Sequence, residues 1–385
     1  MKRKRTQSKT EPEVLLYAAS EYDADALYFG GAFVPDPFIA FSCKGKRVAV
    51  LSQLEIARVA KEGRFDELVS LEELVSKTLA KTSKEDFLYP GSLIQQVAKE
   101  FGIRSFKISG TFPAGPLFQL QKLGFKVELA EGMLFPEREF KIDQEAAMIR
   151  EGNAASSAGF KVVEKLLRES DIRKGWLYHA GKKLTSELVQ QAIAIECLKR
   201  GAIAENTIVA GGDQACDPHC RGNGPLKANS FIIVDIFPKI SATGFHGDMT
   251  RTYLKGKPSD AQRDLYKTVF DAQQEALVAH RAGRSGAKIF NHVKDTFDSK
   301  GYLTEIRDGV PVGFIHGLGH GLGLEIHEPP RVNKAGQRLR KGQVITVEPG
   351  LYYPGLGGVR VEDVVRVNAG EPEMLSKHSY RWHIR

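Results

Sequence analysis

The sequence predicts two domains: a smaller α/β domain, followed by an α+β domain in which a curved antiparallel sheet is backed by helices. A chain of 385 residues is longer than one hydrophobic core normally supports, which favours two domains. In the first 140 residues, short apolar strands alternate with helices, a pattern typical of α/β domains. In the remainder, helical patterns are set between β-branched runs that carry charged side chains, which favours a sheet covered by helices.

The α/β assignment of the first domain depends on helix starts and on short apolar runs. Capping boxes predict three helix starts, at Ser52 with Glu55, Ser70 with Glu73 and Ser92 with Gln95. Gly102 and Gly124 are expected to end helices. The expected strands are Ala26 to Gly30, Arg47 to Leu51, Ser105 to Ile108 and Phe125 to Leu129.

The boundary between the domains is expected where the charged stretch Pro136 to Glu139 gives way to a long helical pattern that begins at Gln144. We therefore expect a disordered basic tail over residues 1–10, the α/β domain over residues 11–140 and the α+β domain over residues 141–385.

Three further helices of the second domain are predicted from their caps, which are Thr185, Ser259 with Gln262, and Ser285. The first is expected over residues 186–200, the second to about Arg281, and the third as far as Gly301. The periodicity predicts these inward-facing residues: Leu188, Ala192 and Ile195 in the first helix, and Leu265, Val269, Ala272 and Ala276 in the second.

Composition and charge exclude several classes of protein. The net charge is +8, of which Lys2 to Arg5 supply half, so the remainder is only mildly basic and a nucleic-acid partner is not expected. The sequence has no long apolar span, and a polar stretch follows the basic start, so we expect a cytoplasmic protein without a membrane partner. Four scattered cysteines are too few for a disulfide scaffold.

Five side chains that bind metals well follow one another in the last third of the chain: Asp235, Asp248, His320, Glu348 and Glu362. Four carboxylates with one imidazole suit two divalent ions of the Mn, Fe, Co or Zn kind better than one structural zinc, which prefers thiolates and histidines. Two such ions about 3.5 Å apart can activate a water molecule and polarise the carbonyl that it attacks. This chemistry indicates amide hydrolysis.

The local sequence around both aspartates supports this interpretation. Asp235 is the one charge in the apolar run from Phe231 to Ile236, where a buried unpaired carboxylate would cost several kcal/mol without a cation. Asp248 follows Gly247 and begins a second β-rich run. Two neighbouring strands could therefore direct both aspartates to one point.

The local sequence around the histidines and glutamates also supports a metal site. His316, His320 and His327 lie within twelve residues, separated by glycines that let the backbone approach a ligand closely. Glu348 and Glu362 each lie in a β-branched run, and the turn between these runs contains Pro354 and several glycines. A hairpin would bring both glutamates together.

On these five segments, the chain resembles the pita-bread metallopeptidases, a family that includes methionine aminopeptidase, aminopeptidase P and prolidase. The resemblance covers roughly residues 141–385 and implies a dinuclear metal site. It implies that Asp248 and Glu362 bridge the two ions, that Asp235 chelates one, and that His320 with Glu348 binds the other. The first domain would match the family's creatinase-like N-terminal domain, with a role in subunit contact and in covering the site.

The resemblance also implies roles for individual residues that their spacing in the sequence does not reveal. Glu348 is expected to act as the general acid and base. His327 is expected to stabilise the tetrahedral intermediate, and His316 and His219 are expected to line the pocket for the residue after the scissile bond. Arg360 resembles an arginine that orients a ligand carboxylate. Arg331, four residues after His327, either clamps the carboxylate of a dipeptide or is an ordinary surface arginine.

The motifs from His316 to His327 and around both glutamates resemble the proline-peptidase branch more than the methionine aminopeptidases. One departure is the longer segment between Asp235 and Asp248, in which Phe237-Pro238 stands where a glycine is usual and Lys239 to Gly244 forms the extra turn. We expect a homodimeric Xaa-Pro exopeptidase, aminopeptidase P-like or prolidase-like, that uses two ions, with Mn favoured, on short peptides with proline second. A methionine aminopeptidase, or a non-catalytic peptide- or nucleic-acid-binding protein on the same fold, stays open as an alternative.

Overall fold

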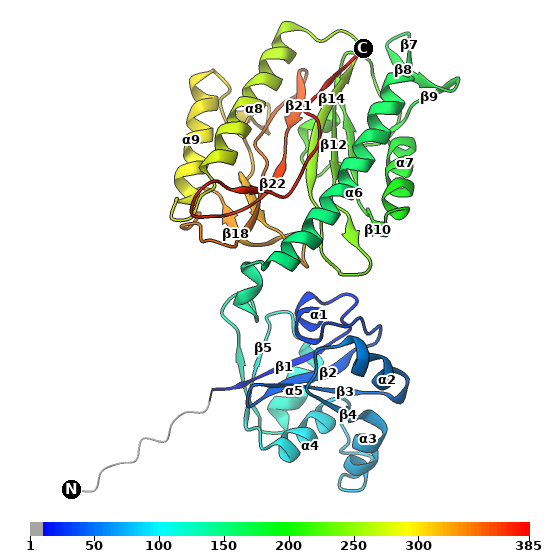
Figure 1. Ribbon diagram of the computed structural model, residues 1–385, viewed down its shortest axis with the longest axis vertical. Coiled ribbons are helices and arrows are strands. Elements are labelled where there is room, and N and C mark those ends of the chain that lie inside the picture. The colour runs from blue at the N-terminus through cyan, green and yellow to red at the C-terminus, as the bar shows by residue number, and fades with distance from the viewer. Residues whose placement is uncertain (1–10) are drawn as a thin grey trace, which may run out of the picture. The chain divides into compact units, whose positions relative to one another are not determined.

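The computed structural model describes residues 11–385, so the basic tail expected over residues 1–10 lies outside the described residues. The chain divides into two compact units, Met1–Glu137 and Arg138–Arg385. Figure 1 shows the elements of each unit. The short η1 helix, Pro136–Glu139, lies where the two units meet in the sequence.

The first unit contains one six-stranded sheet with the strand order β4-β3-β2-β1-β5-β6. β1, β2 and β3 pair antiparallel, and the outer strands β4, β5 and β6 pair parallel to their neighbours. The strands are β1 Glu13–Ala18, β2 Phe38–Cys43, β3 Lys46–Leu51, β4 Glu67–Ser70, β5 Ser105–Ile108 and β6 Lys126–Leu129. The helices are α1 Ala24–Gly30, α2 Gln53–Glu62, α3 Leu71–Leu79, α4 Gly91–Phe101 and α5 Ala114–Lys122. The predicted α/β character is confirmed.

Two local predictions in this unit are wrong. The run from Ala26 to Gly30 is helix α1, because the Asp23 side chain accepts a hydrogen bond from the Ala26 amide and Gly31 ends the helix in the left-handed conformation. Ser92 lies inside α4, which starts after Pro90, and its hydroxyl accepts from the Leu88 amide. Short apolar runs fit a strand or a buried helix equally well, so the period alone does not distinguish them.

The other predicted helix starts and strands in this unit agree with the structure, although the capping box predicted at Ser52 does not form. Ser70 caps α3 and accepts from the Glu73 amide. Ser52 occupies the cap position of α2 without a side-chain hydrogen bond. The strands expected from Arg47, Ser105 and Phe125 correspond to β3, β5 and β6.

The second unit is built around two mainly antiparallel sheets, which are larger than the other sheets of this unit. One has the order β11-β12-β14-β24, in which β24 joins parallel, and the other has the order β18-β17-β19-β22-β23. Their strands are β11 Ile208–Gly211, β12 Phe231–Ile236, β14 Met249–Lys255, β24 His383–Ile384, β17 Gly319–Gly321, β18 Glu328–Val332, β19 Val344–Val347, β22 Asp363–Arg366 and β23 Glu373–Met374. The pair β20 Gly350–Tyr353 and β21 Gly357–Arg360 continues from the second sheet.

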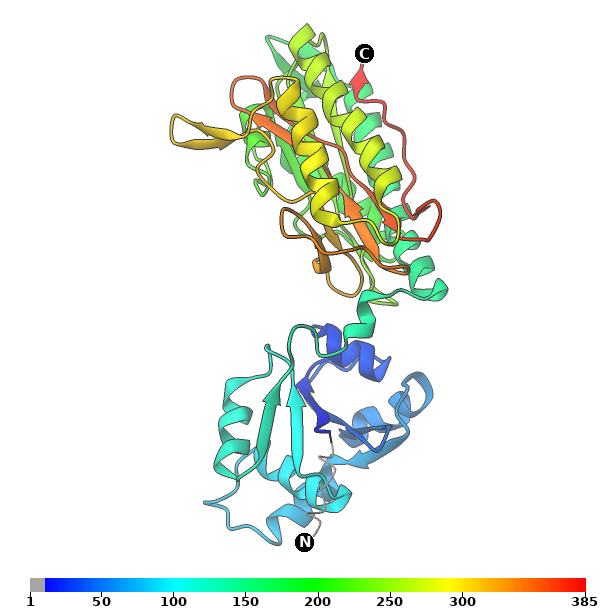
Figure 2. The ribbon, with the colours of Figure 1, turned by 90° about the vertical axis from the view of Figure 1, so that its left-hand side faces the viewer.

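Helices cover both sheets of the second unit. They are α6 Asp143–Arg168, α7 Ser186–Leu198, α8 Asp260–Ala279 and α9 Gly286–Ser299. Phe160 of α6 and Ile193 of α7 share a core with Val234 of β12, whereas Val269 of α8 and Val293 of α9 share another with strands of the second sheet. α8 and α9 lie side by side in Figures 1 and 2. The predicted sheet backed by helices is confirmed.

The remaining elements of this unit are short. They are β7 Asp171–Arg173, β8 Trp176–His179, β9 Lys182–Lys183, β10 Ala202–Ile203, β13 Lys239–Ile240, β15 Glu305–Arg307, β16 Val310–Val312 and the helix η2 Gly212–Cys216.

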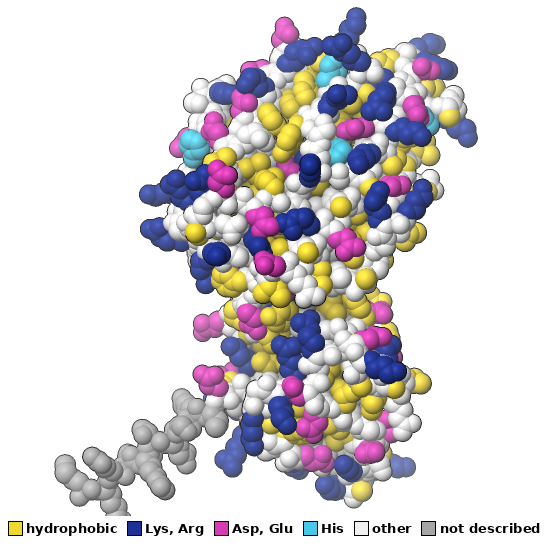
Figure 3. Space-filling model, viewed as in Figure 1, with side chains coloured by type: hydrophobic (Ala, Val, Ile, Leu, Met, Phe, Trp, Pro, Cys, Tyr) yellow, Lys and Arg dark blue, Asp and Glu magenta, His cyan; other side chains and the backbone are white. Residues whose placement is uncertain are grey.

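Lys and Arg side chains are interspersed with Asp and Glu side chains over the face in Figure 3. Within residues 11–385, no helix is long and apolar enough to cross a bilayer.

The predicted caps of α7, α8 and α9 are confirmed, since Thr185, Ser259 and Ser285 each accept a hydrogen bond from the first turn. All four inward residues predicted for α8 are buried. The inward face predicted for α7 is wrong, because Leu188 and Ile195 are 45% and 50% exposed. The buried face of α7 carries Val189, Ile193 and Cys197, one or two positions further along the helix than the predicted residues.

A close backbone contact places Asp248. Gly152 of α6 faces Gly247, and a Cβ atom added to Gly152 would lie 2.4 Å from the Gly247 amide nitrogen. Asn153, the next residue of α6, accepts a hydrogen bond from the Asp248 amide at 2.8 Å. Helix α6 therefore approaches the start of β14 without a side chain between them.

We predict that Gly152→Ala destabilises the fold by about 1–3 kcal/mol, although alanine is the better helix former, because the added methyl group meets backbone atoms that cannot turn aside. Urea unfolding measures the difference. Gly370→Ala, where an added Cβ meets nothing within 4 Å, is the control and should stay within about 0.5 kcal/mol of the wild type. Equal stability of both variants would contradict the close contact.

Candidate metal centre

The two aspartates of the site come from adjacent strands. Asp235 lies near the end of β12, and Asp248 directly precedes β14. In the antiparallel register, Asp235 pairs with Thr250, so Asp248 is its diagonal neighbour, two residues away on the same face. The predicted convergence of the two aspartates follows from this register.

The two glutamates lie at matching positions of a long hairpin. β19 pairs with β22 as far as Val347 and Asp363, and β20 pairs with β21 from Gly350 and Arg360 onward. Glu348 and Glu362 lie in the short interruption between these two ladders, on opposite arms. The predicted hairpin is confirmed, and its register places Glu348 opposite Glu362.

His320 lies in β17, between β18 and β19. Its Nδ1 atom lies 3.0 Å from the carbonyl oxygen of Gly321 and must donate to it, so the neutral ring carries its lone pair on Nε2. Nε2 lies 3.6 Å from Asp248 Oδ2 and 3.5 Å from Glu348 Oε1. Burial lowers the pKa of His320 to about 3, so these contacts place a lone pair against carboxylate oxygens.

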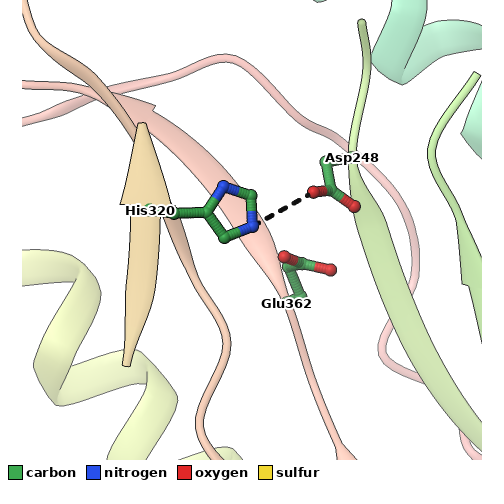
Figure 4. Close-up of side chains that lie close together, drawn as sticks. All are labelled: Asp248, His320 and Glu362. Atoms are coloured by element: carbon green, nitrogen blue, oxygen red, sulfur yellow. Dashed lines mark ion pairs between the residues drawn. The ribbon is translucent and has the colours of Figure 1, made fainter. Parts of the chain in front are cut away.

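Three of these side chains converge most closely. Figure 4 shows Asp248, His320 and Glu362 pointing toward one another from different strands. One ligand atom from each lies within 4.8 Å of the others. Asp235 and Glu348 line the same cavity, so the structure brings together all five residues that the sequence selected as ligands.

The carboxylates of this cluster repel one another. Burial, together with the charges of Asp235 and Glu348, raises the pKa of Asp248 well above its usual range. Burial and the charge of Asp248 do the same to the pKa of Glu362. Burial raises the pKa of Glu348 to about 7, even though Arg360 opposes the shift. The protein alone supplies too little positive charge to keep all of these groups ionised.

The donor atoms fit divalent cations. Asp235 Oδ2 accepts from Arg360 at 2.8 Å, whereas its buried Oδ1 has no hydrogen-bond partner among residues 11–385. Positive ions placed between these side chains would pair with the free oxygen of Asp235 and with the lone pair of His320. They would also offset the repulsion among the carboxylates. The residues present therefore fit a metal site with oxygen and imidazole ligands.

A buried hydrogen-bond network surrounds the ligands. Thr250 donates to Glu362 Oε2 at 2.8 Å and accepts from Arg360 Nε at 3.2 Å. Tyr352 accepts from Arg360 at 3.0 Å and lies 2.7 Å from His316 Nε2. Because His316 Nδ1 lies against the Gly317 carbonyl at 2.7 Å, Nε2 must accept from the Tyr352 hydroxyl. Thr250 and Tyr352 were missed by sequence reasoning.

The cavity of about 490 Å³ is lined by all ten residues that the sequence selected. His316 is half-buried, whereas His219, His327 and Arg331 are exposed and accessible from the cavity. The His320 and His327 rings lie 4.4 Å apart between centroids. The full set is Asp235, Asp248, His320, Glu348, Glu362, His316, His219, His327, Arg331 and Arg360. Their individual roles stay predictions.

Several further residues of the cavity were missed as site residues by sequence reasoning. Asn206, Arg221, Phe237, Ile326 and Asn333 also line the cavity. Arg221 follows His219 by two residues, so its proximity to a predicted pocket residue was the signal that could have found it.

The fold and the ligand set together define a metal-dependent peptidase of the pita-bread class. The chain belongs to metallopeptidase family M24, whose model matches residues 147–369, more than half of the chain. This match contains all five predicted ligands.

Two relatives carry the name Xaa-Pro dipeptidase. The one from Pyrococcus furiosus is 34% identical over 176 residues, which cover 45% of this chain and 48% of that protein. The one from Pyrococcus horikoshii is 28% identical over 285 residues, covering 72% of this chain and 74% of that protein. The first alignment therefore spans about half the length of the relative.

Solved structures show that the whole fold is shared. An X-Pro aminopeptidase from Thermotoga maritima matches with a TM-score of 0.78 and 22% identity, covering 97% of each chain. An Xaa-Pro dipeptidase from Bacillus anthracis matches with a TM-score of 0.78 and 24% identity, covering 97% of this chain and 95% of the other. These likenesses extend over both units.

We predict that Thr250→Val lowers the affinity for Mn²⁺ by about 10- to 100-fold, because Glu362 loses the donor that orients it. Isothermal titration calorimetry of the metal-stripped protein measures the change. Thr252→Val is the matched control, since Thr252 lies on the same strand and bonds only to the backbone of Arg360. Equal losses of affinity in both variants would contradict a specific role for Thr250.

Proposed function

We propose that this protein is an exopeptidase that uses two divalent metal ions to hydrolyse the bond before proline in short Xaa-Pro peptides. One observation carries the proposal: four carboxylates, three of them buried, and one buried imidazole share a cavity with three further histidines. The names of the Xaa-Pro dipeptidase relatives support the choice of substrate.

Asp235, Asp248, His320, Glu348 and Glu362 would hold the ions, with Asp248 and Glu362 as the bridging ligands. When bound, such ions lower the pKa of a water molecule and polarise the scissile carbonyl. Of the possible ions, Mn²⁺ is proposed, with Co²⁺, Fe²⁺ or Zn²⁺ as alternatives for the same oxygen and imidazole donors.

Glu348 would take the proton from the attacking water and deliver it to the leaving nitrogen. Burial raises the pKa of Glu348 to about 7, which suits a group that must both accept and release a proton. His327 would donate to the oxygen of the tetrahedral intermediate. It is exposed to the cavity and lies beside His320, so it can reach a substrate next to the ligands.

His316 would form part of the wall for the residue after the scissile bond. Burial and the charge of Arg360 lower the pKa of His316 to about 4, so the ring is neutral and its orientation is fixed by Tyr352. His219 and Arg331 would complete this pocket. A cavity of about 490 Å³ accommodates a small ligand or a short peptide.

Two forms of the activity differ in peptide length. A prolidase-like enzyme would bind the carboxylate of a dipeptide through Arg331, whereas an aminopeptidase P-like enzyme would accept longer peptides. Relatives and solved neighbours carry both kinds of name. The expected homodimer and the cytoplasmic location are part of this proposal.

We predict that Glu348→Gln loses about 10²- to 10⁴-fold in kcat while the protein still folds, because the acid and base is removed without a change of shape. Hydrolysis of an Xaa-Pro dipeptide in the presence of Mn²⁺ measures the loss. Glu371→Gln, at an exposed position outside the cavity, is the control and should retain full activity. Wild-type turnover in Glu348→Gln would disprove the assigned role.

We predict that removal of metal by a chelator abolishes hydrolysis and that added Mn²⁺ or Co²⁺ restores it. The site needs cations both to ionise its carboxylates and to activate water. Activity that persists after metal content has fallen to zero by mass spectrometry would exclude the proposed chemistry.

Substrate class is tested by comparing Xaa-Pro dipeptides, Xaa-Pro tripeptides and Met-Ala peptides. We predict that both proline series are cleaved and that methionine is not released. Preference for dipeptides would indicate a prolidase, and preference for tripeptides an aminopeptidase P. Faster release of methionine would overturn the proposed substrate and favour methionine aminopeptidase.

A further inference from the structure

Glu328, which directly follows His327, is held by a buried ionic cluster. It is 1% exposed, its Oε1 atom accepts from Arg138 at 2.6 Å, and its Oε2 atom accepts from Lys141 at 2.6 Å. The side chains of Arg138 and Lys141 are 4% and 2% exposed. Burial acts to raise the pKa of Glu328, but Lys141 and Arg138 outweigh it, so the pKa is lowered and the group is ionised. Loss of the Glu328 charge would leave the buried Lys141 ammonium without its carboxylate partner.

The same carboxylate is bonded to the loop that carries His327. Residues 322–327 form neither helix nor strand. Glu328 Oε1 accepts from the Glu325 amide at 3.2 Å, and the His246 amide donates to the Gly323 carbonyl at 2.9 Å. Glu328 also supports this loop by close packing, because a Cβ added to Gly323 would lie 2.6 Å from Glu328 Oε2.

The metal ligand next to this loop is held in a different way. His320 lies in β17, where strand pairing with β18 and its Nδ1 contact to Gly321 fix the ring. Glu328 opens β18 and pairs with Gly321, on the far side of a bulge from His320. A shift of Glu328 would therefore move His327 relative to a ring that the sheet retains.

We propose that Glu328 is a positioning residue, which Arg138 and Lys141 lock in place so that it holds the His327 loop beside the metal centre. This inference rests on the proposed function, in which His327 donates to the reacting oxygen. It also gives the first residues of the second unit a part in the reaction, since Arg138 and Lys141 supply the charges that fix the loop. A displacement of about 1 Å at a reacting group can cost about 10²-fold in rate.

The first test is the kinetics of Glu328→Gln, which keeps the shape of the side chain and removes its charge. We expect kcat to fall about 10- to 100-fold, with KM within about 3-fold of the wild type and with the same number of Mn²⁺ ions bound. Glu325→Gln is the matched control, because Glu325 pairs with the same Arg138 but is 56% exposed, and its kcat should be unchanged. Unchanged kcat in Glu328→Gln, or an equal fall in Glu325→Gln, would overturn the inference.

The second test separates positioning from general stability by a double-mutant cycle with His327→Ala. If Glu328 acts through His327, then Glu328→Gln should lower kcat by less than about 2-fold in the His327→Ala background. Fully additive losses would overturn the inference. Should the single variant not fold, Glu328→Gln combined with Lys141→Met removes one buried charge of each sign and enters the same cycle with the same expectations.

The two proposals fail in different ways. If the wild type hydrolyses no Xaa-Pro peptide under any metal, the proposed function is wrong. If the wild type is active and its kcat does not depend on Glu328, the proposed function stands and the role of Glu328 is wrong.

Discussion

Mutual repulsion among buried carboxylates is the constraint on which the rest of the second unit depends. Asp248 and Glu362 are 4% and 2% exposed, and burial together with the charges of neighbouring carboxylates raises the pKa of each well above its usual range. Arg360 is also buried and bonds to Asp235, but one guanidinium cannot balance four carboxylates. In the proposed metal centre, bound cations would supply the missing charge.

Strands of both sheets hold the four carboxylates close together despite their repulsion. β12 and β14 hold the aspartates on one face, and the interrupted hairpin of β19 to β22 presents both glutamates at one level. The glycine contact with α6 fixes the start of β14. Thr250, Tyr352 and Arg360 then orient the ligand and pocket side chains, so that little freedom is left at the atoms that would meet a metal.

The sequence predicted a site residue correctly where few structural roles are possible for that residue type in its local sequence. A carboxylate inside an apolar run, such as Asp235, needs a compensating charge wherever the chain folds, so its place in the site could be predicted. Thr250 and Tyr352 could not be found in this way, because a threonine or tyrosine in a strand is ordinary. The cluster of Glu328 with Arg138 and Lys141 joins residues 190 and 187 positions apart in the sequence, and no local pattern contains such contacts. The prediction of the inward face of α7 was wrong because apolar residues occur on two faces of that helix. Only tertiary packing decides which of the two faces is buried.

Anomalous diffraction from crystals grown with Mn²⁺ tests the central claim most directly, since it locates the ions without reference to activity. The account predicts two manganese peaks among Asp235, Asp248, His320, Glu348 and Glu362, with Asp248 and Glu362 in contact with both. Absence of manganese at this cluster, or peaks held by other residues, would contradict it.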